Sequence, residues 1–153
     1  MTDLISIQTE DFDMACLHEQ LRAEDASCGA IVTFTGIVRE LDGAEHLRGI
    51  FLEHYPGMTH KALVKIVAQA RERWPLGRVT LIHRIGELLG NDNIVYVGVS
   101  SRHRVAAFEA AQFIMDYLKR DAPFWKKELL ADDERWVEQK DSDLDAAEKW
   151  GAS

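Results

Sequence analysis

Cysteine, proline and long hydrophobic runs are all scarce in this sequence. It has two cysteines and three prolines in 153 residues. Cys16 and Cys28 stand in no CxxC or ligand-spaced cluster, so a disulfide, a zinc site or a redox motif has no support. Free cysteine is among the most buried residue types, and we expect both to be small buried side chains. No run of about 18 apolar residues occurs, which argues against a membrane-spanning helix.

Positive charge is also scarce. The chain carries 18 Lys and Arg against 26 Asp and Glu, a net charge of −8. A general nucleic-acid binder needs a basic face, so this class is disfavoured. The N-terminal residues have neither the basic start nor the apolar centre of a signal peptide. With 46% hydrophobic residues and no linker or repeat, the sequence predicts one soluble, cytoplasmic domain over 1–153.

The common catalytic and metal-binding motifs are missing as well. There is no Walker loop, GxGxxG, GxSxG or Cys/His nucleophile motif. The six histidines are scattered, and His54 and His83 form no HxH or HExxH pair. We therefore expect no metal and no cofactor.

Apolar periodicity predicts alternating strands and helices. A β-branched and aromatic run predicts a strand over 30–39, with Gly36 as a bulge, and a strand over 49–55 as its hairpin partner. Short turns between neighbouring strands favour an α+β fold, with a largely antiparallel sheet covered by helices on one side. The remaining predictions are strands at 4–7, 79–85 and 94–100, the last two joined through a turn over 86–93, extended segments after Pro123, and a final helix over 144–150.

Three more helices follow from caps and apolar stripes. Thr9 or Asp11 caps the first, Thr59 the second, and Ser100 or Ser101 the third. Their apolar stripes contain Met14, Leu17 and Leu21; Leu63, Ile66, Val67, Ala70 and Trp74; and Val105, Phe108, Ala111, Met115 and Leu118.

The third helix gathers an unusual share of the cations. In a chain of net charge −8, basic residues stand at its start, at its end and just beyond it. This pattern indicates an anionic ligand. Cations in the first turn oppose the helix dipole, although an ordinary solvated basic turn explains them equally well on local grounds. The candidate cations are Arg39, His103, Arg104, Lys119, Lys126 and Lys127.

The two ends of that helix differ in what they indicate. A lysine at a helix C-terminus, such as Lys119, suits the dipole and is unremarkable alone. Lys126 and Lys127 follow a Pro-Phe-Trp turn that should anchor them, and a lysine desolvated beside other cations can act as a base, acid or nucleophile. Sixteen residues separate His103 from Lys119, roughly 24 Å of helix, too far for one pocket. Either the ends serve different ligands or a two-fold dimer joins them; we favour the dimer.

Several stretches together resemble a known family. They are VTFTGIVR at 32–39, LEHYPGMT at 52–59, RWPLGRVTLIHRIGEL at 73–88, SSRHR at 100–104, FEAAQFIMDYLK at 108–119 and APFWKKE at 122–128. In this order, from about Ala30 to Trp150, they closely resemble the large, catalytic subunits of molybdopterin synthase. The departures lie before Ala30 and in the 40–47 loop.

The resemblance implies an αβ-hammerhead fold and a sulfurtransferase of molybdenum cofactor biosynthesis. In this family a small ubiquitin-like carrier subunit inserts its C-terminal Gly-Gly thiocarboxylate into the large subunit. Cyclic pyranopterin monophosphate, a phosphorylated pterin, then receives two sulfurs to form the dithiolene of molybdopterin. The large subunit forms a homodimer, so that the whole assembly is a heterotetramer. Because the carrier brings the sulfur, neither cysteine is expected to react.

The resemblance also implies site residues. Lys119 and Lys126 are the expected catalytic lysines, Lys119 against the carrier's thiocarboxylate and Lys126 acting on substrate. Phe34 and Met115 are expected to line the pocket. Arg39, His103 and Arg104 would hold phosphate, the latter two from the neighbouring subunit. The full substrate-binding set is Ile37, Val38, Arg39, His103, Arg104, Lys119, Lys126, Lys127 and Glu128.

Two other functions fit the same basic residues. A non-enzymatic adaptor could capture the tail of a ubiquitin-like protein there. A phosphodiesterase for a small cyclic phosphate would need no sulfur carrier. Turnover of the pterin separates both from the sulfurtransferase, whereas carrier binding alone does not separate the adaptor.

Overall fold

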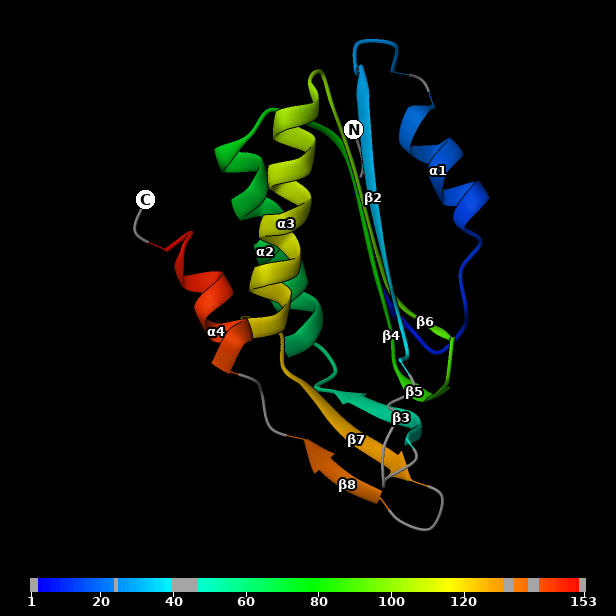
Figure 1. Cartoon of the computed structure of the whole chain (residues 1–153). Helices are drawn as coiled ribbons and strands as arrows, with labels where there is room; N and C mark the ends of the chain where they lie inside the picture. The colour runs from blue at the N-terminus through cyan, green and yellow to red at the C-terminus, as the bar shows by residue number, and fades with distance from the viewer. Residues whose placement is uncertain (1–2, 24, 40–46, 131–133, 138–140, 152–153) are drawn as a thin grey trace.

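The computed structural model describes residues 3–23, 25–39, 47–130, 134–137 and 141–151, and Figure 1 shows its elements. The predicted 40–47 loop lies almost wholly outside the described residues. In chain order the elements are β1 (Leu4–Gln8), α1 (Met14–Arg22), β2 (Ala30–Ile37), β3 (Leu47–His54), α2 (Met58–Arg73), β4 (Leu76–Arg84), β5 (Gly86–Leu89), β6 (Asn93–Ser101), α3 (Arg104–Asp121), β7 (Phe124–Leu130), β8 (Glu134–Val137) and α4 (Asp141–Glu148).

The first sheet has the strand order β1-β4-β6-β2. β1 runs parallel to β4, and the other pairs are antiparallel. The expectation that helices cover one side is wrong, because α1 packs on one face and α2 and α3 pack on the other (Figure 1). The reason is visible in β4 and β6, whose central residues are buried whichever face they point to. A strand buried on both faces needs cover on both.

The second sheet has the order β5-β3-β7-β8, entirely antiparallel. The predicted β2–β3 hairpin is therefore wrong, since β2 pairs with β6 and β3 pairs with β5 and β7. Residues 86–89, predicted as turn, form β5. Gly86 has φ 89°, which lets the chain leave the first sheet, and Leu88 is then buried opposite Ile50. The mixed α+β class and the predominance of antiparallel pairs are confirmed, as is the bulge at Gly36–Ile37.

The main core lies between the first sheet and the helices α2 and α3. The predicted stripe of α2 is confirmed, with Leu63, Ile66, Val67 and Ala70 buried. The stripe of α3 is partly wrong, because Val105 and Phe108 are exposed. The helix buries instead a face made of Ala107, Ala110, Ala111, Phe113, Ile114, Tyr117 and Leu118.

The helix caps differ from those predicted. Asp13 caps α1, and its Oδ1 accepts from the Cys16 N–H at 3.2 Å. Gly57 and His103 occupy the N-cap positions of α2 and α3, without a side-chain cap bond. Ser100 and Ser101, which were predicted as caps, lie in β6 instead. The Ser100 hydroxyl accepts a hydrogen bond from the Arg78 N–H, and the Ser101 hydroxyl donates one to the Pro75 carbonyl.

The buried-cysteine expectation is also corrected. Cys16 is exposed on α1 and Cys28 is half-buried. The short α1 buries only Leu17 and Leu21, and Cys16 lies about 100° away from Leu17 around the helix, so it points away from the core.

Candidate active site

The end of α3 passes almost directly into β7. Lys119 lies in the last turn of the helix, and the Ala122 N–H closes the helix on the Leu118 carbonyl at 3.2 Å. Pro123 cannot continue a helix, and Phe124 begins the strand. Lys119 and Lys126 are thereby held on two rigid elements that meet at one corner. We call residues 119–128 the α3–β7 corner.

Strand pairing determines which way the residues of β7 point. Lys126 pairs with Leu52 and Glu128 with Ile50, and paired residues in an antiparallel sheet share a face. Leu52 and Ile50 belong to the small core between the sheets. Lys126 and Glu128 therefore lie on the face turned toward the first sheet. Lys127 is on the opposite face, with its Nζ 5.9 Å from the centre of the Phe51 ring.

A buried histidine lies behind the corner. His83 of β4 is 5% exposed, and its ring stacks on Phe124 with centroids 3.9 Å apart and an interplanar angle of 19°. The His83 pKa is lowered to about 4, mainly because the ring is buried; the nearby charges of Lys119 and His54 add to this shift, and the hydrogen bond to the Arg84 carbonyl opposes it. The ring is consequently neutral near pH 7. The sequence placed His83 in a strand, but nothing local indicated that it meets the corner.

A second feature is a hollow of about 560 Å³ beyond the end of β2. It is lined by three of the predicted substrate-binding residues, Ile37, Val38 and Arg39, together with Gly90 and Asn91. Backbone bonds fix its wall: the Val38 N–H donates to the Asp92 carbonyl, and the Asn91 N–H to the Val38 carbonyl, both at 2.9 Å. Asn91 has φ 74°. Gly90 and Asn91 were recognisable in the sequence as turn residues but not as pocket residues.

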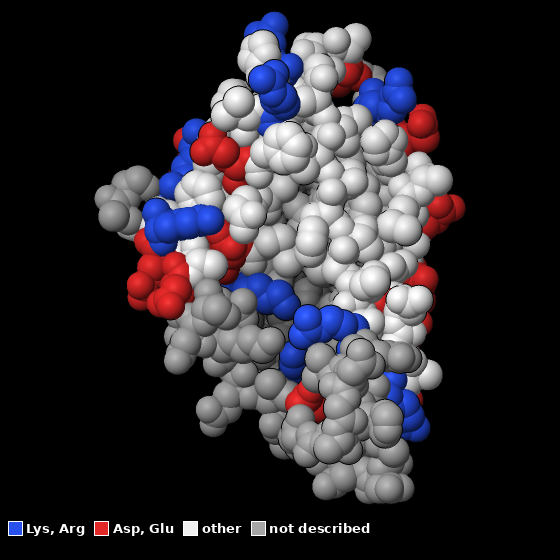
Figure 2. Space-filling view, viewed as in Figure 1, with Lys and Arg blue, Asp and Glu red and all other residues white. Residues whose placement is uncertain are grey.

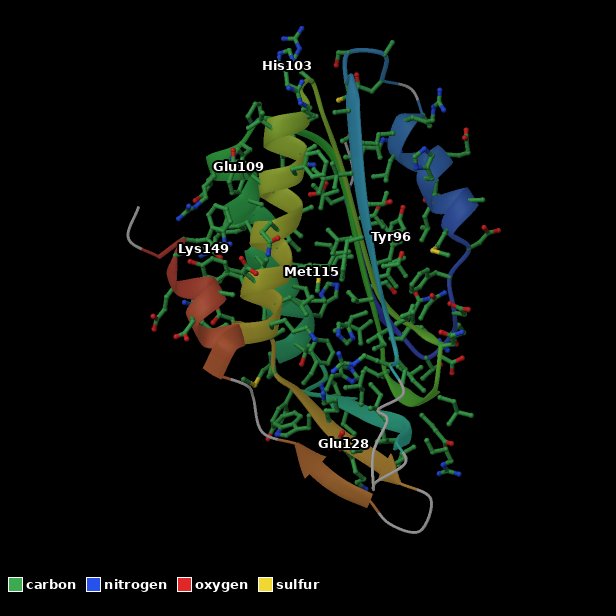
Figure 3. The ribbon with its side chains drawn as sticks, in the orientation of Figure 1. Tyr96, His103, Glu109, Met115, Glu128 and Lys149 are labelled. Atoms are coloured by element: carbon green, nitrogen blue, oxygen red, sulfur yellow. The ribbon has the colours of Figure 1, made fainter. Side chains whose placement is uncertain are left out.

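The other predicted site residues lie elsewhere on α3 and β2. Figure 3 shows His103 at one end of α3 and Glu128 beyond the other, with Met115 between them on the side of the helix facing the sheet. Met115 is half-buried against the main core, and Phe34 is 43% exposed on β2. One chain thus carries Lys119 and Lys126 on the two elements that meet at the α3–β7 corner, with His103 and Arg104 at the other end of α3.

Charge is unevenly distributed over this side of the molecule. Figure 2 shows a broad area free of Lys, Arg, Asp and Glu over β2 and α3, and Lys and Arg gathered below it, where α3 gives way to the second sheet. Among the described residues, no group of three or more His, Cys, Asp or Glu is placed to hold a metal ion. No helix in the described part of the chain is long and apolar enough to cross a membrane.

Comparison with known proteins identifies related chains. The family model described as "MoaE protein" matches residues 7–121. The molybdopterin synthase catalytic subunit of Vibrio cholerae is 54% identical over 150 residues, covering 98% of this chain and 99% of that protein. The structure of a molybdopterin biosynthesis MoaE protein from Burkholderia ambifaria superposes with a TM-score of 0.84 at 47% identity, covering 99% of this chain and 100% of that chain.

A more distant structure shares the fold. It is a protein–protein complex of subunits 1 and 2 of the molybdopterin-converting factor from Helicobacter pylori, with a TM-score of 0.74 at 20% identity. It covers 89% of this chain and 91% of that chain.

Proposed function

This chain belongs to the MoaE protein family, and from that premise we propose that the α3–β7 corner is the site where it transfers sulfur. Its function is that of a molybdopterin synthase catalytic subunit, an enzyme that transfers sulfur in molybdopterin formation. The observation that supports the corner as the site is the joint placement of two lysines. The His83 ring stacks on Phe124, the first residue of β7, and its pKa is lowered by burial and by the charge of Lys119, so this buried ring lies where the end of α3 meets the strand that carries Lys126.

The two lysines are assigned different tasks. Lys119, exposed at the end of α3, would contact the thiocarboxylate of the carrier, polarise its carbonyl and stabilise the negative charge that develops there. Lys126, half-buried beside the small core, would donate or accept a proton as sulfur adds to the pterin. The task of Lys126 benefits from its partial burial, because a charge acts more strongly where water is excluded.

The substrate and partner follow from the family. The substrate is cyclic pyranopterin monophosphate, and the partner is a small ubiquitin-like carrier ending in a Gly-Gly thiocarboxylate. Arg39 lines the hollow beyond β2, where it would bind the phosphate with Ile37 and Val38 beside it. Lys127 and Glu128 remain predicted substrate-binding residues, and Phe34 and Met115 remain predicted lining residues. The sulfur transfer takes place in the cytoplasm.

His103 and Arg104 complete the site from a second copy of the chain. They begin α3, roughly 24 Å from Lys119 by helix length. A two-fold axis through the middle of the uncharged area would place the start of one α3 near the end of the other. Exposed Phe34, Val105 and Phe108 on this side are apolar groups that a second copy would cover.

The edge of β2 supports the same arrangement. Within the described part of the chain, β2 pairs only with β6, so its other edge is open. Antiparallel pairing of two β2 edges would set Ala30 of one copy near Ile37 of the other. Ala30 pairs with Ser101, two residues before His103. The second copy's His103 and Arg104 would then approach the hollow at Ile37–Arg39. With one carrier on each copy, the assembly is a heterotetramer.

The test is reconstitution. The chain is mixed with the thiocarboxylated carrier and the cyclic pterin, and the dithiolene product is measured. Formation of the product with one carrier consumed for each sulfur transferred is the expected result. Tight carrier binding without product would instead indicate an adaptor. Opening of the cyclic phosphate without a carrier would indicate a phosphodiesterase.

A further inference from the structure

His83 is held in one orientation by its own strand. Its Nδ1 lies 2.8 Å from the Arg84 carbonyl oxygen. A carbonyl only accepts hydrogen bonds, so Nδ1 carries the proton and donates. Arg84 is the last residue of β4, after which the chain leaves the first sheet. The ring is therefore fixed at the point where the two sheets diverge.

One face of the His83 ring packs against the start of β7. The near-parallel stack on Phe124, at 3.9 Å, joins β4 to the first residue of that strand. Phe124 pairs with His54 of β3 and shares its face of β7 with Lys126, two residues later. A shift of Phe124 would consequently be passed to Lys126 along a rigid strand.

The ring also lies beside the other lysine. The charged groups that act on it are Lys119 from α3 and His54 from β3, and both oppose its protonation. A flat, uncharged side chain suits this position, because it stacks on Phe124 and adds no competing cation beside Lys119.

We propose that His83 is a positioning residue of the sulfur-transfer site, which sets the start of β7, and with it Lys126, in place relative to Lys119. The inference rests on the proposed function of the two lysines. It assigns no proton transfer to His83 itself. Positional errors of about 1 Å can cost about 100-fold in rate, so a support of this kind affects turnover more than binding.

The test compares kcat and KM for the pterin in the reconstituted system. His83→Ala removes the stack and is expected to lower kcat by about 100-fold while KM changes by less than about threefold. His83→Phe keeps a flat neutral ring and is expected to recover most of kcat. Ile82→Ala is the matched control, because Ile82 is equally buried on the same strand but packs with Leu17 and Tyr96 on the opposite face.

A double-mutant cycle that combines His83→Ala with Phe124→Ala tests whether His83 acts through its stack on Phe124. If the stack carries the effect, the double variant loses no more kcat than the more damaged single variant. The inference is overturned if Ile82→Ala slows turnover as much as His83→Ala, if His83→Phe is as slow as His83→Ala, or if the two losses simply multiply. An inactive wild-type chain with competent carrier would instead contradict the proposed function.

Discussion

Lys126 and Lys127 are neighbours in the sequence, but β7 turns their side chains to opposite faces. Lys126 shares a face with Leu52 and the small core, whereas Lys127 lies over Phe51. Lys119 reaches the same corner from the end of a helix. The role of each lysine therefore depends on which face of β7 its ammonium group occupies. Two lysines at consecutive positions of a strand point to opposite faces and do not contribute equally to one pocket.

Replacing either lysine of the corner should stop sulfur transfer. Lys119→Ala and Lys126→Ala are each expected to cut turnover by orders of magnitude without unfolding the chain, because each removes a charge placed for the reaction. The measurement is single-turnover dithiolene formation, with circular dichroism to verify the fold. Lys65→Ala, an exposed position on α2, serves as the control. Near-normal turnover by a corner variant would remove that lysine from the mechanism.

His83 should make stability depend on pH. Its pKa is about 4 in the folded chain against 6.5 in the unfolded chain, so the unfolded state binds more protons between these values. The contribution of neutral His83 to the free energy of unfolding is fully present above pH 6.5. As the pH falls toward 4, the chain loses up to about 3 kcal/mol of this stability. Urea unfolding of wild type and His83→Phe should show this difference. Parallel pH curves for the two proteins would contradict it.

At the scale of elements, one hydroxyl joins three segments. Thr59, fully buried in the first turn of α2, accepts from the Tyr55 N–H and donates to the Pro123 carbonyl, both at 2.9 Å. It thereby connects the end of β3, the start of α2 and the entry to β7. The sequence marked Thr59 as a helix cap, yet its structural task is to tie the α3–β7 corner to the helix beside it.

Thr59→Val should loosen that connection. The substitution nearly preserves the shape but leaves the partly buried Tyr55 N–H and Pro123 carbonyl without the Thr59 hydroxyl, which costs about 1–3 kcal/mol. Urea unfolding measures the loss, and Thr59→Ser, which keeps the hydroxyl, is the control. A valine variant as stable as wild type would show that the bridge contributes nothing.

At the scale of the whole molecule, each site is expected to use two copies of the chain. The uncharged area over β2 and α3 is bordered by the corner at one end and by His103 at the other (Figures 2 and 3). Phe108, one turn into α3, is 62% exposed in the described part of the chain. Burial of such an area against a second copy would supply both stability and the missing cations.

Mixing two inactive variants should restore activity. In a dimer of one Lys119→Ala chain and one Arg104→Ala chain, one site keeps both residues, so random mixing should recover roughly a quarter of wild-type turnover. Mixing Lys119→Ala with Lys126→Ala should recover nothing, because both losses fall on the same side of each site. No recovery in the first mixture would place each site within a single chain.

Periodicity and local chemistry were enough to predict most of the elements. The stripe of α2, the bulge at Gly36 and the antiparallel β4–β6 pair follow from residues close in sequence. The prediction of a β2–β3 hairpin was wrong because burial across the whole sheet, and not proximity along the chain, determines which strands pair. The predicted core face of α3 was wrong at Val105 and Phe108 for a related reason. Apolar spacing does not determine whether a helix face packs on the chain's own sheet or remains exposed.

By itself the sequence determined the family, the α+β class and the cations near one helix, since these depend on residue identity and spacing. Only the tertiary structure decided that Lys126 and Lys127 face opposite ways, that Gly90 and Asn91 border the hollow at Arg39, and that His83 lies against the corner. These contacts join segments about 40 to 75 residues apart, and no local propensity specifies such contacts. They arise when the sheets and helices of the described chain pack their apolar surfaces against one another.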